Sequence, residues 1–193
     1  MALPAEKKRY TFADVLTWEE NERIEIINGE AFMMAPPSSY HQRISMELSR
    51  QLANYLDGKR CDVFSAPFGV RLFERDGDSP EDVDTMVEPD ISVVCDPSKI
   101  DKRGCKGAPD LVIEILSPST RRHDIRTKTN LYQRAGVREY WIVSPEENMV
   151  QVFLLEDGRY TFKDSGADGD KLKVNVLEDC FIDLSKVLTE QAG

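Results

Sequence analysis

Two carboxylates in apolar surroundings are the residues of this chain best placed to do chemistry. Asp90 begins a nearly continuous apolar run over 90–95, and Glu114 lies inside another over 110–116. A buried carboxylate is unfavourable unless it is paired or bound to a metal. If the two runs are neighbouring strands, Asp90 and Glu114 converge at one end of the sheet, where two negative charges favour a cation between them.

A divalent cation at this pair would suit phosphate chemistry. Mg²⁺ or Mn²⁺ prefers oxygen ligands and keeps several waters, so it can also take up a phosphate oxygen. It would activate water and neutralise charge that develops on phosphorus. Lys128, on a helix expected after Glu114, would stabilise that charge or help to deprotonate the water. The structural alternative is a buried ion pair between Glu114 and Lys128 or an arginine.

Two further residues are candidates for the same site. Glu25 interrupts the apolar run over 24–27 with a carboxylate. His41 lies three residues before Ile44, on the apolar stripe of an expected helix. A lone histidine in such a place is more often a satisfied core or near-surface residue than a ligand, and both roles stay open for His41.

The charges of the chain are unevenly distributed. The sequence has 25 Lys and Arg against 35 Asp and Glu, a net charge of −10 that argues against a general nucleic-acid coat protein. Residues 121–138 reverse this balance, with six basic residues against one acid. This segment predicts either a phosphate-contacting patch or a helix face with scattered salt bridges. The candidate phosphate contacts are Ser117, Ser119, Thr120, Arg121, Arg122 and Arg126.

The first half of the chain predicts two helices and a hairpin. A short helix is expected over 11–20. Asn28-Gly29 between two apolar runs predicts a hairpin, because a type I′ turn needs positive φ at both positions. Ser38 or Ser39 is expected to cap a helix that runs to about residue 57 and has an apolar stripe at three- and four-residue spacing. That stripe is Ile44, Leu48, Leu52 and Tyr55.

The second half predicts a crossover unit. Strands over 110–116 and 139–144 flank a helix over 124–135, and this order makes the two strands parallel. Further strands are expected over 68–73, 90–95, 149–155 and 160–163. The earlier strands are joined by loops, so we expect antiparallel pairing there. The sum is an α/β domain with a mixed β-sheet flanked by helices.

Length, hydropathy and cysteine spacing bound the class of protein. A chain of 193 residues favours a single domain over 1–193 with a short N-terminal extension, 1–10. No apolar run approaches the roughly 18 residues of a membrane span, and the N-terminus lacks the apolar core of a secretory signal. A cytoplasmic location with no membrane partner is therefore expected. The four cysteines lack CxxC spacing, which argues against zinc, and are expected to be reduced thiols.

Several long stretches of the chain match one family pattern. They are 25–30, 87–94, the block Gly107 to Thr120 and 139–143, together with His41, Asp124, Lys128 and Tyr132. On these residues the chain resembles the Uma-two (Uma2) family of restriction-endonuclease-like proteins over nearly its whole length. The resemblance implies a PD-(D/E)XK nuclease fold, a mixed sheet flanked by helices.

The resemblance also implies roles for individual residues. It implies Asp90 and Glu114 as metal-binding acids and Glu25 as an additional acid. The usual motif has a lysine two residues after the second acid, but that position is Leu116 here, and Lys128 on the following helix takes its place. Ser144 stands where the family pattern has an aspartate, a change that we expect to affect a turn more than catalysis.

The leading hypothesis is a Mg²⁺- or Mn²⁺-dependent endonuclease that acts on DNA. Restriction-type nucleases often pair to cut both strands, so a homodimer is an expectation by fold analogy. One alternative is a nuclease-fold binding or interaction module that does not cleave, favoured by the net charge of −10. Another is a metal hydrolase of a small phosphorylated molecule, for which a deep narrow pocket would be diagnostic.

Overall fold

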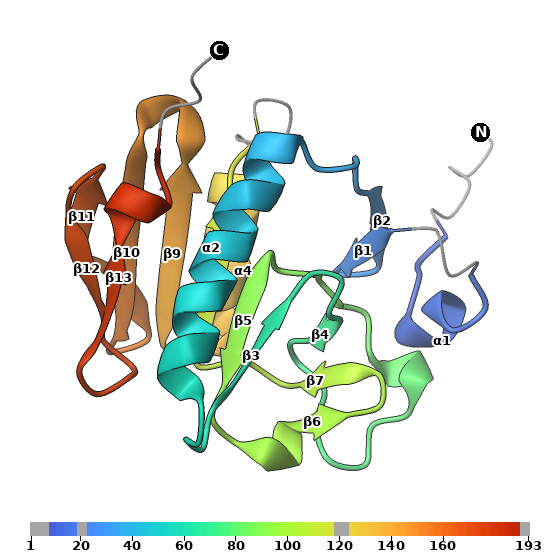
Figure 1. Ribbon diagram of the computed structural model, residues 1–193. Coiled ribbons are helices and arrows are strands. Elements are labelled where there is room, and N and C mark those ends of the chain that lie inside the picture. The colour runs from blue at the N-terminus through green and yellow to red at the C-terminus, as the bar shows by residue number, and fades with distance from the viewer. Residues whose placement is uncertain (1–7, 19–22, 118–123, 190–193) are drawn as a thin grey trace.

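A six-stranded mixed sheet forms the centre of the computed structural model, which describes residues 8–18, 23–117 and 124–189 (Figure 1). Its strand order is β11-β10-β9-β8-β5-β3. The strands are β3 (Asp62–Ser65), β5 (Ile91–Val94), β8 (Leu111–Ile115), β9 (Glu139–Ser144), β10 (Met149–Glu156) and β11 (Arg159–Ala167). β8 and β9 are parallel and the other neighbouring pairs are antiparallel, so the expected mixed sheet is confirmed.

The expected crossover connects β8 to β9. Glu114 of β8 lies opposite Ile142 of β9 in the parallel register. The helix predicted over 124–135 consists of a π-helical segment, η3 (Asp124–Lys128), followed by α4 (Thr129–Ala135). α4 ends at Gly136, whose φ of 88° lies in the left-handed region that glycine adopts without a steric penalty.

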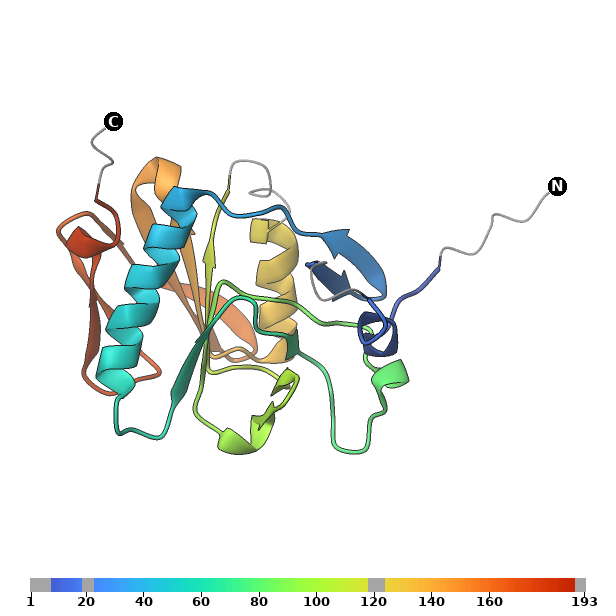
Figure 2. The same cartoon turned by 45° about the vertical axis from the view of Figure 1, so that its right-hand side comes forward.

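Helices cover both faces of the central sheet. α2 (Ser39–Leu56) crosses one face, and α4 lies on the other (Figure 2). The hairpin β12 (Lys171–Val174) and β13 (Cys180–Asp183) packs beside α2. A small sheet of β4 (Val70–Arg71), β7 (Gly104–Lys106) and β6 (Ile100–Asp101) contributes to the core on the α4 side. The sheet is therefore buried on both faces, as its nearly continuous apolar strands predict.

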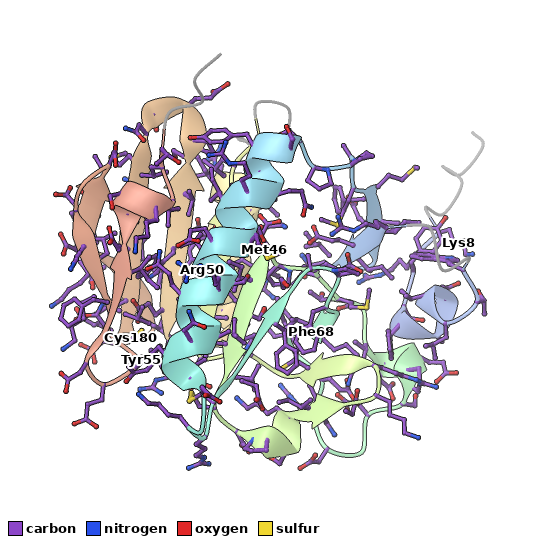
Figure 3. All side chains as sticks on the ribbon, in the orientation of Figure 1. Lys8, Met46, Arg50, Tyr55, Phe68 and Cys180 are labelled. Carbon is purple, nitrogen blue, oxygen red and sulfur yellow. A yellow bond between two sulfur atoms is a disulfide. The ribbon has the colours of Figure 1, made fainter. Side chains whose placement is uncertain are left out.

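The helix α2 follows the predicted apolar stripe. Ile44, Leu48 and Leu52 are fully buried against the sheet, while Leu56 ends the stripe and Tyr55 is only half-buried. Ser38 is the N-cap, and its Oγ accepts a hydrogen bond from the His41 backbone N–H at 3.2 Å. Met46 and Arg50 lie on the outward side of this helix (Figure 3).

The N-terminal hairpin forms at the predicted turn. β1 (Ile24–Ile27) and β2 (Glu30–Met33) are joined by Asn28 and Gly29, with φ of 49° and 80°. A bridge between Ile26 and Met86 attaches β1 to the segment that leads into β5. The helix expected over 11–20 is shorter, because the structure has one capped turn, α1 (Phe12–Val15).

Two predictions are wrong. The strand expected over 68–73 is reduced to Val70–Arg71, in the small sheet. The four cysteines are not all reduced thiols, because Cys61 and Cys95 form a disulfide. The antiparallel register of β3 and β5 places Asp62 opposite Val94. The same register, continued by one residue, places Cys61 opposite Cys95, although the two are 34 positions apart in the sequence. Cys105 and Cys180 are free and buried.

None of the helices in the described ranges is both long and apolar enough to traverse a lipid bilayer.

Candidate functional site

Asp90 and Glu114 lie at the same end of the central sheet. β5 and β8 are antiparallel neighbours with Ile91 opposite Ile113, so the same register places Asp90 opposite Glu114. The backbone N–H of Ile115 donates to Asp90 Oδ2 at 2.8 Å, which fixes this carboxylate against β8. Strand pairing therefore brings together two acids that are 24 positions apart in the chain.

Lys128 joins Glu114 to Glu25. The Lys128 Nζ lies 3.0 Å from Oε1 of Glu25 and 3.0 Å from Oε1 of Glu114. The three side chains come from η3, β1 and β8, and the residues are only 3%, 4% and 5% exposed, respectively. Tyr132, one turn after Lys128, donates its hydroxyl to Glu114 Oε1 at 2.5 Å. The helix after β8 thus supplies both an ammonium and a phenol to the same carboxylate oxygen.

The Glu114 carboxyl has more negative than positive charge among its neighbours. Burial, together with the negative charges of Asp90 and Glu25, raises the pKa of Glu114 to about 8. The Lys128 ammonium and the Tyr132 hydrogen bond act in the opposite direction. Burial also raises the pKa of Tyr132, which keeps its phenol protonated as a donor. Glu114 thus has two carboxylates and one ammonium as charged neighbours, an excess of negative charge that an additional cation would stabilise.

Glu25 faces Lys128 and the backbone rather than Asp90. Besides Lys128, its Oε1 accepts a hydrogen bond from the Glu88 backbone N–H at 2.9 Å. The Glu88 side chain in turn accepts two hydrogen bonds from Arg23, at 3.1 and 3.0 Å. Glu25 therefore anchors the Lys128 ammonium from the hairpin side.

His41 reaches Asp90 from the first turn of α2. Its Nε2 lies 3.2 Å from Asp90 Oδ2. Its Nδ1 is buried, and no hydrogen-bond partner for it exists among the residues that the structure describes. Of the two roles left open by the sequence, the structure gives His41 a place beside a candidate acid rather than in the apolar core.

The carboxylates of Asp90 and Glu114 suit a hard cation. Within the described segments, all hydrogen bonds to the Asp90 carboxylate go to Oδ2, and all those to the Glu114 carboxylate go to Oε1. The other oxygen of each carboxylate has no hydrogen bond to these segments. No group of three or more His, Cys, Asp or Glu side chains in residues 8–18, 23–117 and 124–189 is arranged to hold a metal. A Mg²⁺ or Mn²⁺ ion at Asp90 and Glu114 would therefore have two carboxylate ligands among these residues and would complete its coordination with water or substrate oxygens.

A cavity of about 150 Å³ opens beside Asp90. Its polar lining comes from the loop before β1, the first half of α2, the end of β3 and the start of β5. The polar lining residues are Arg23, His41, Gln42, Ser45, Ser65 and Asp90. The cavity thus adjoins one of the two candidate metal ligands.

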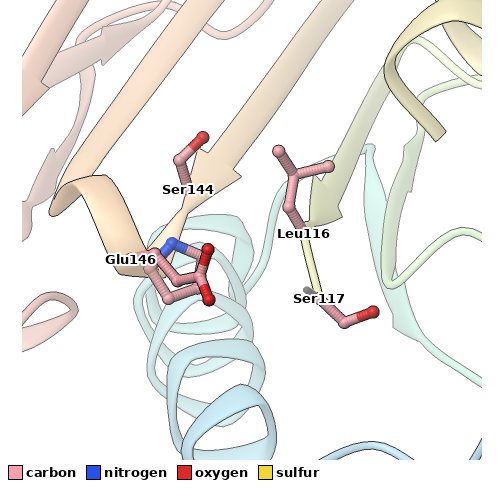
Figure 4. Close-up of a pocket in the computed structure, with 5 residues that line it drawn as sticks. Leu116, Ser117, Ser144 and Glu146 are labelled. Atoms are coloured by element: carbon pink, nitrogen blue, oxygen red, sulfur yellow. The ribbon is translucent and has the colours of Figure 1, made fainter. Parts of the chain in front are cut away.

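A second hollow lies where β8 and β9 end. Its volume is about 10 Å³, near the smallest that admits one water, and Leu116, Ser117, Ser144 and Glu146 contribute to its lining (Figure 4). Leu116 occupies the position at which the nuclease motif has its lysine.

The basic segment 121–138 is described only in part. Ser119, Thr120, Arg121 and Arg122 lie outside the described residues, while Ser117 is half-buried and Arg126 is exposed. Two other basic residues have structural contacts. Arg138 pairs with Asp110 Oδ1 at 3.1 Å, and Arg134 lies over the ring of Phe73 at 5.3 Å. The end of this segment follows the salt-bridge alternative, and phosphate contacts at its start stay a prediction.

Sequence reasoning gave no role to Tyr132, Arg23 or Glu139. Tyr132 stands four residues after Lys128, so helical spacing could have placed both on one face. Glu139 is fully buried yet satisfied, since it accepts hydrogen bonds from Trp141, Asn175 and Val176 at 2.7, 3.1 and 2.8 Å. It is a structural carboxylate that ties β9 to the segment after β12.

Comparisons with known proteins give a matching family and two relatives. Residues 12–185 match the Uma2 family model, described as "Putative restriction endonuclease". Two Synechocystis sp. relatives are uncharacterized protein slr1290, 29% identical over 165 residues, and uncharacterized protein sll1609, 27% identical over 148 residues. The first alignment covers 84% of this chain and 77% of the relative, and the second covers 74% and 79%.

A solved structure shares the fold. A crystal structure from Anabaena variabilis, described as "a putative nuclease belonging to DUF820", superposes with a TM-score of 0.70 at 19% identity. The superposition covers 93% of this chain and 97% of that one. The mixed sheet flanked by helices is thus a restriction-endonuclease-like fold, and with a family match over residues 12–185, the chain belongs to the Uma2 family.

Proposed function

We propose that this protein is a Mg²⁺- or Mn²⁺-dependent endonuclease that hydrolyses phosphodiester bonds in DNA. The observation that carries the proposal is the paired carboxylates of Asp90 and Glu114 beside the Lys128 ammonium, at one end of the sheet. Membership of a family described as "Putative restriction endonuclease" supports the same chemistry.

Each residue of the site has a distinct task in this proposal. Asp90 and Glu114 hold the cation through the oxygens that make no hydrogen bond to the described residues. The cation, when bound, supplies charge neutralisation at the phosphate and lowers the pKa of water. Lys128 places a positive charge where the phosphorane develops negative charge. Tyr132 holds Glu114 in orientation through its 2.5 Å hydrogen bond.

The basic start of segment 121–138 contacts the DNA backbone in this proposal. Ser117 and Arg126 flank the undescribed residues 118–123, which include Ser119, Thr120, Arg121 and Arg122. Contacts of this kind release counterions, so DNA affinity should fall as salt rises. A concentrated basic segment also reconciles DNA binding with a net charge of −10.

The test combines calorimetry with a plasmid-nicking assay on the wild type and Glu114→Gln. Wild type should bind Mn²⁺ and nick plasmid, and the variant should lose both while it stays folded. Asp110→Asn is the matched control. Asp110 directly precedes the first residue of β8, far from Glu114 near the end of that strand, and it contacts Cys95 N and Arg138. Unchanged binding and nicking in Glu114→Gln would refute the assignment.

A binding module that does not cleave is the second candidate. Lys128 forms ion pairs with both Glu25 and Glu114, so these two carboxylates have a protein partner without a cation. This candidate predicts no Mn²⁺ binding in a folded wild-type protein at millimolar metal. A hydrolase of small phosphorylated molecules would instead bind Mn²⁺, spare plasmid and cleave p-nitrophenyl phosphate.

A further inference from the structure

We propose that the cavity beside Asp90 is a subsite for a nucleic-acid phosphate next to the one being cleaved, with Arg23 as its anion-binding residue. This inference rests on the proposed function, because it identifies which part of the substrate the cavity takes. It assigns a binding role to Arg23, Gln42 and Ser45.

The dimensions of the cavity suit a phosphate group. A volume of about 150 Å³ corresponds to about five water molecules, at roughly 30 Å³ each. This is room for one phosphate and part of its sugar. The cavity reaches the surface, because Gln42 and Ser65 in its lining are exposed. A strand bound at Asp90 can therefore extend into it without a rearrangement of the fold.

Arg23 presents an unused donor. Its Nε and Nη2 both donate to the same oxygen, Glu88 Oε2. Its Nη1 has no hydrogen-bond partner among the residues described, and its side chain is 30% exposed. A guanidinium offers five N–H donors in a planar fork that matches phosphate oxygens. Glu88 thus holds the arginine in place, and the remaining donors are available to a ligand.

Neutral donors complete the lining. The side chains of Gln42, Ser45 and Ser65 line the same cavity and make no hydrogen bond within the described parts of the chain. An amide and two hydroxyls around one guanidinium are a donor set that recognises phosphate oxygens. Gln42 and Ser45 are three residues apart on α2, so one helix face supplies both.

The charges of the cavity make phosphate binding depend on metal. Asp90 lies in the wall, and Glu88 balances part of the Arg23 charge. A phosphate is therefore opposed by Asp90 until a cation neutralises that carboxylate. Cation and phosphate should bind cooperatively, and each should raise the affinity for the other by the same factor.

Calorimetry with thymidine 3′,5′-bisphosphate tests the subsite without cleavage, since this probe has no diester bond. Arg23→Gln removes the charge, and Ser45→Leu fills the volume from a helical position without changing any charge. Arg50→Gln is the matched control, an exposed α2 arginine that also pairs with a glutamate, Glu47. Thermal melting of each variant confirms that it is folded.

In millimolar Mn²⁺, we expect both cavity variants to weaken bisphosphate binding by about tenfold or more. Arg23→Gln loses a charge-assisted hydrogen bond, and Ser45→Leu loses the space for the phosphate. Arg23→Lys should recover part of the affinity. Mn²⁺ affinity without the probe should stay within about twofold of the wild type in all variants, because none of these side chains contacts a carboxylate ligand. Inorganic phosphate should bind more weakly than the bisphosphate.

Two results would overturn the subsite. One is equal bisphosphate affinity in the wild type, Arg23→Gln and Ser45→Leu. The other is inorganic phosphate binding as tightly as the bisphosphate, which would assign the cavity to free phosphate. Failure of the proposed function is a separate outcome: a wild type that binds the bisphosphate through Arg23 but never nicks plasmid keeps the subsite and loses the nuclease.

Discussion

The Lys128 ammonium lies 3.0 Å from the Glu114 carboxylate, although it comes from the helical segment after the strand and not from the strand itself. In the usual nuclease motif the lysine stands two positions after the second acid, which is Leu116 here. The π-helical segment η3 brings Lys128 to the same carboxylate from the α4 face of the sheet. The ammonium beside Glu114 therefore comes from the helical segment and not from β8.

Replacement of Lys128 should separate its catalytic role from its structural role. We expect Lys128→Met to lower plasmid nicking by about 10²-fold or more. It should also destabilise the fold by about 3–5 kcal/mol, because it leaves buried carboxylates without their partner. The free energy of unfolding from urea titration and the nicking rate are the two measurements.

The double variant Lys128→Met with Glu25→Gln serves as the control for stability. Removal of one buried carboxylate should recover part of the free energy of unfolding without recovering nicking. A single variant that nicks at the wild-type rate would contradict the role of Lys128.

Local patterns predicted most of the central sheet and its helices. Nearly continuous apolar runs located β5 and β8, and the three- and four-residue spacing of apolar residues located the buried stripe of α2. The order of elements gave the parallel pair of β8 and β9. β3 was missed, because Asp62–Ser65 is too short and half-exposed to show a clear pattern. The strand over 68–73 was overestimated, because Val70 and Arg71 pair in a separate small sheet.

The contacts between candidate residues were harder to predict than the residues themselves. The buried carboxylate of Glu114 is visible as an acid in an apolar run. That Glu25 binds Lys128, and that His41 reaches Asp90, depends on how β1 and α2 pack on the sheet. No local pattern encodes such packing. The Cys61–Cys95 disulfide was missed for the same reason, since strand register and not spacing brings these residues together.

The Cys61–Cys95 disulfide should stabilise the fold by closing a loop of 34 residues. Restriction of the unfolded chain by such a loop is worth about 4 kcal/mol in the chain-entropy description. The double variant Cys61→Ser with Cys95→Ser should lose about this much free energy of unfolding in urea. The wild type in dithiothreitol should behave in the same way.

Cys105 and Cys180 provide the control for the cysteine variant. Burial raises the pKa of each thiol to about 11, so alkylation of the native protein at neutral pH should be slow. Rapid labelling of four thiols in native protein without reductant would contradict both the disulfide and the burial.

The stability of the metal-free protein should fall as pH rises. The Glu114 carboxyl keeps its proton in the folded state up to a pKa of about 8, whereas the unfolded group loses it near 4.5. The stabilisation is fully present below about pH 4.5 and is lost as pH rises to about 8. Lys128 and Tyr132 reduce this effect, and Glu25 and Asp90 increase it.

Urea titrations in EDTA at several pH values measure this dependence. Glu114→Gln has no proton to lose at this position, so its free energy of unfolding should decline less between pH 5 and pH 9 than that of the wild type. Parallel curves for the two proteins would show that Glu114 is already ionised in the folded state at low pH.

His41 should act on the cation through Asp90. Its Nε2 contacts Asp90 Oδ2, the oxygen that also accepts from Ile115 N, which leaves Oδ1 for the cation. Loss of a side chain that orients a metal ligand lowers metal affinity by about 10–100-fold. We expect this loss of Mn²⁺ affinity in His41→Ala, measured by calorimetry without DNA. His41→Gln, whose amide can still donate to Asp90, should recover part of it.

The control for His41 is Arg43→Ala, an exposed residue on the same helix that hydrogen-bonds Thr189. It should leave Mn²⁺ affinity unchanged, because it contacts neither carboxylate. If His41 had only a packing role, His41→Ala would lower the melting temperature and keep the metal affinity. A fall in metal affinity at an unchanged melting temperature therefore identifies His41 as a residue that positions Asp90 for the cation.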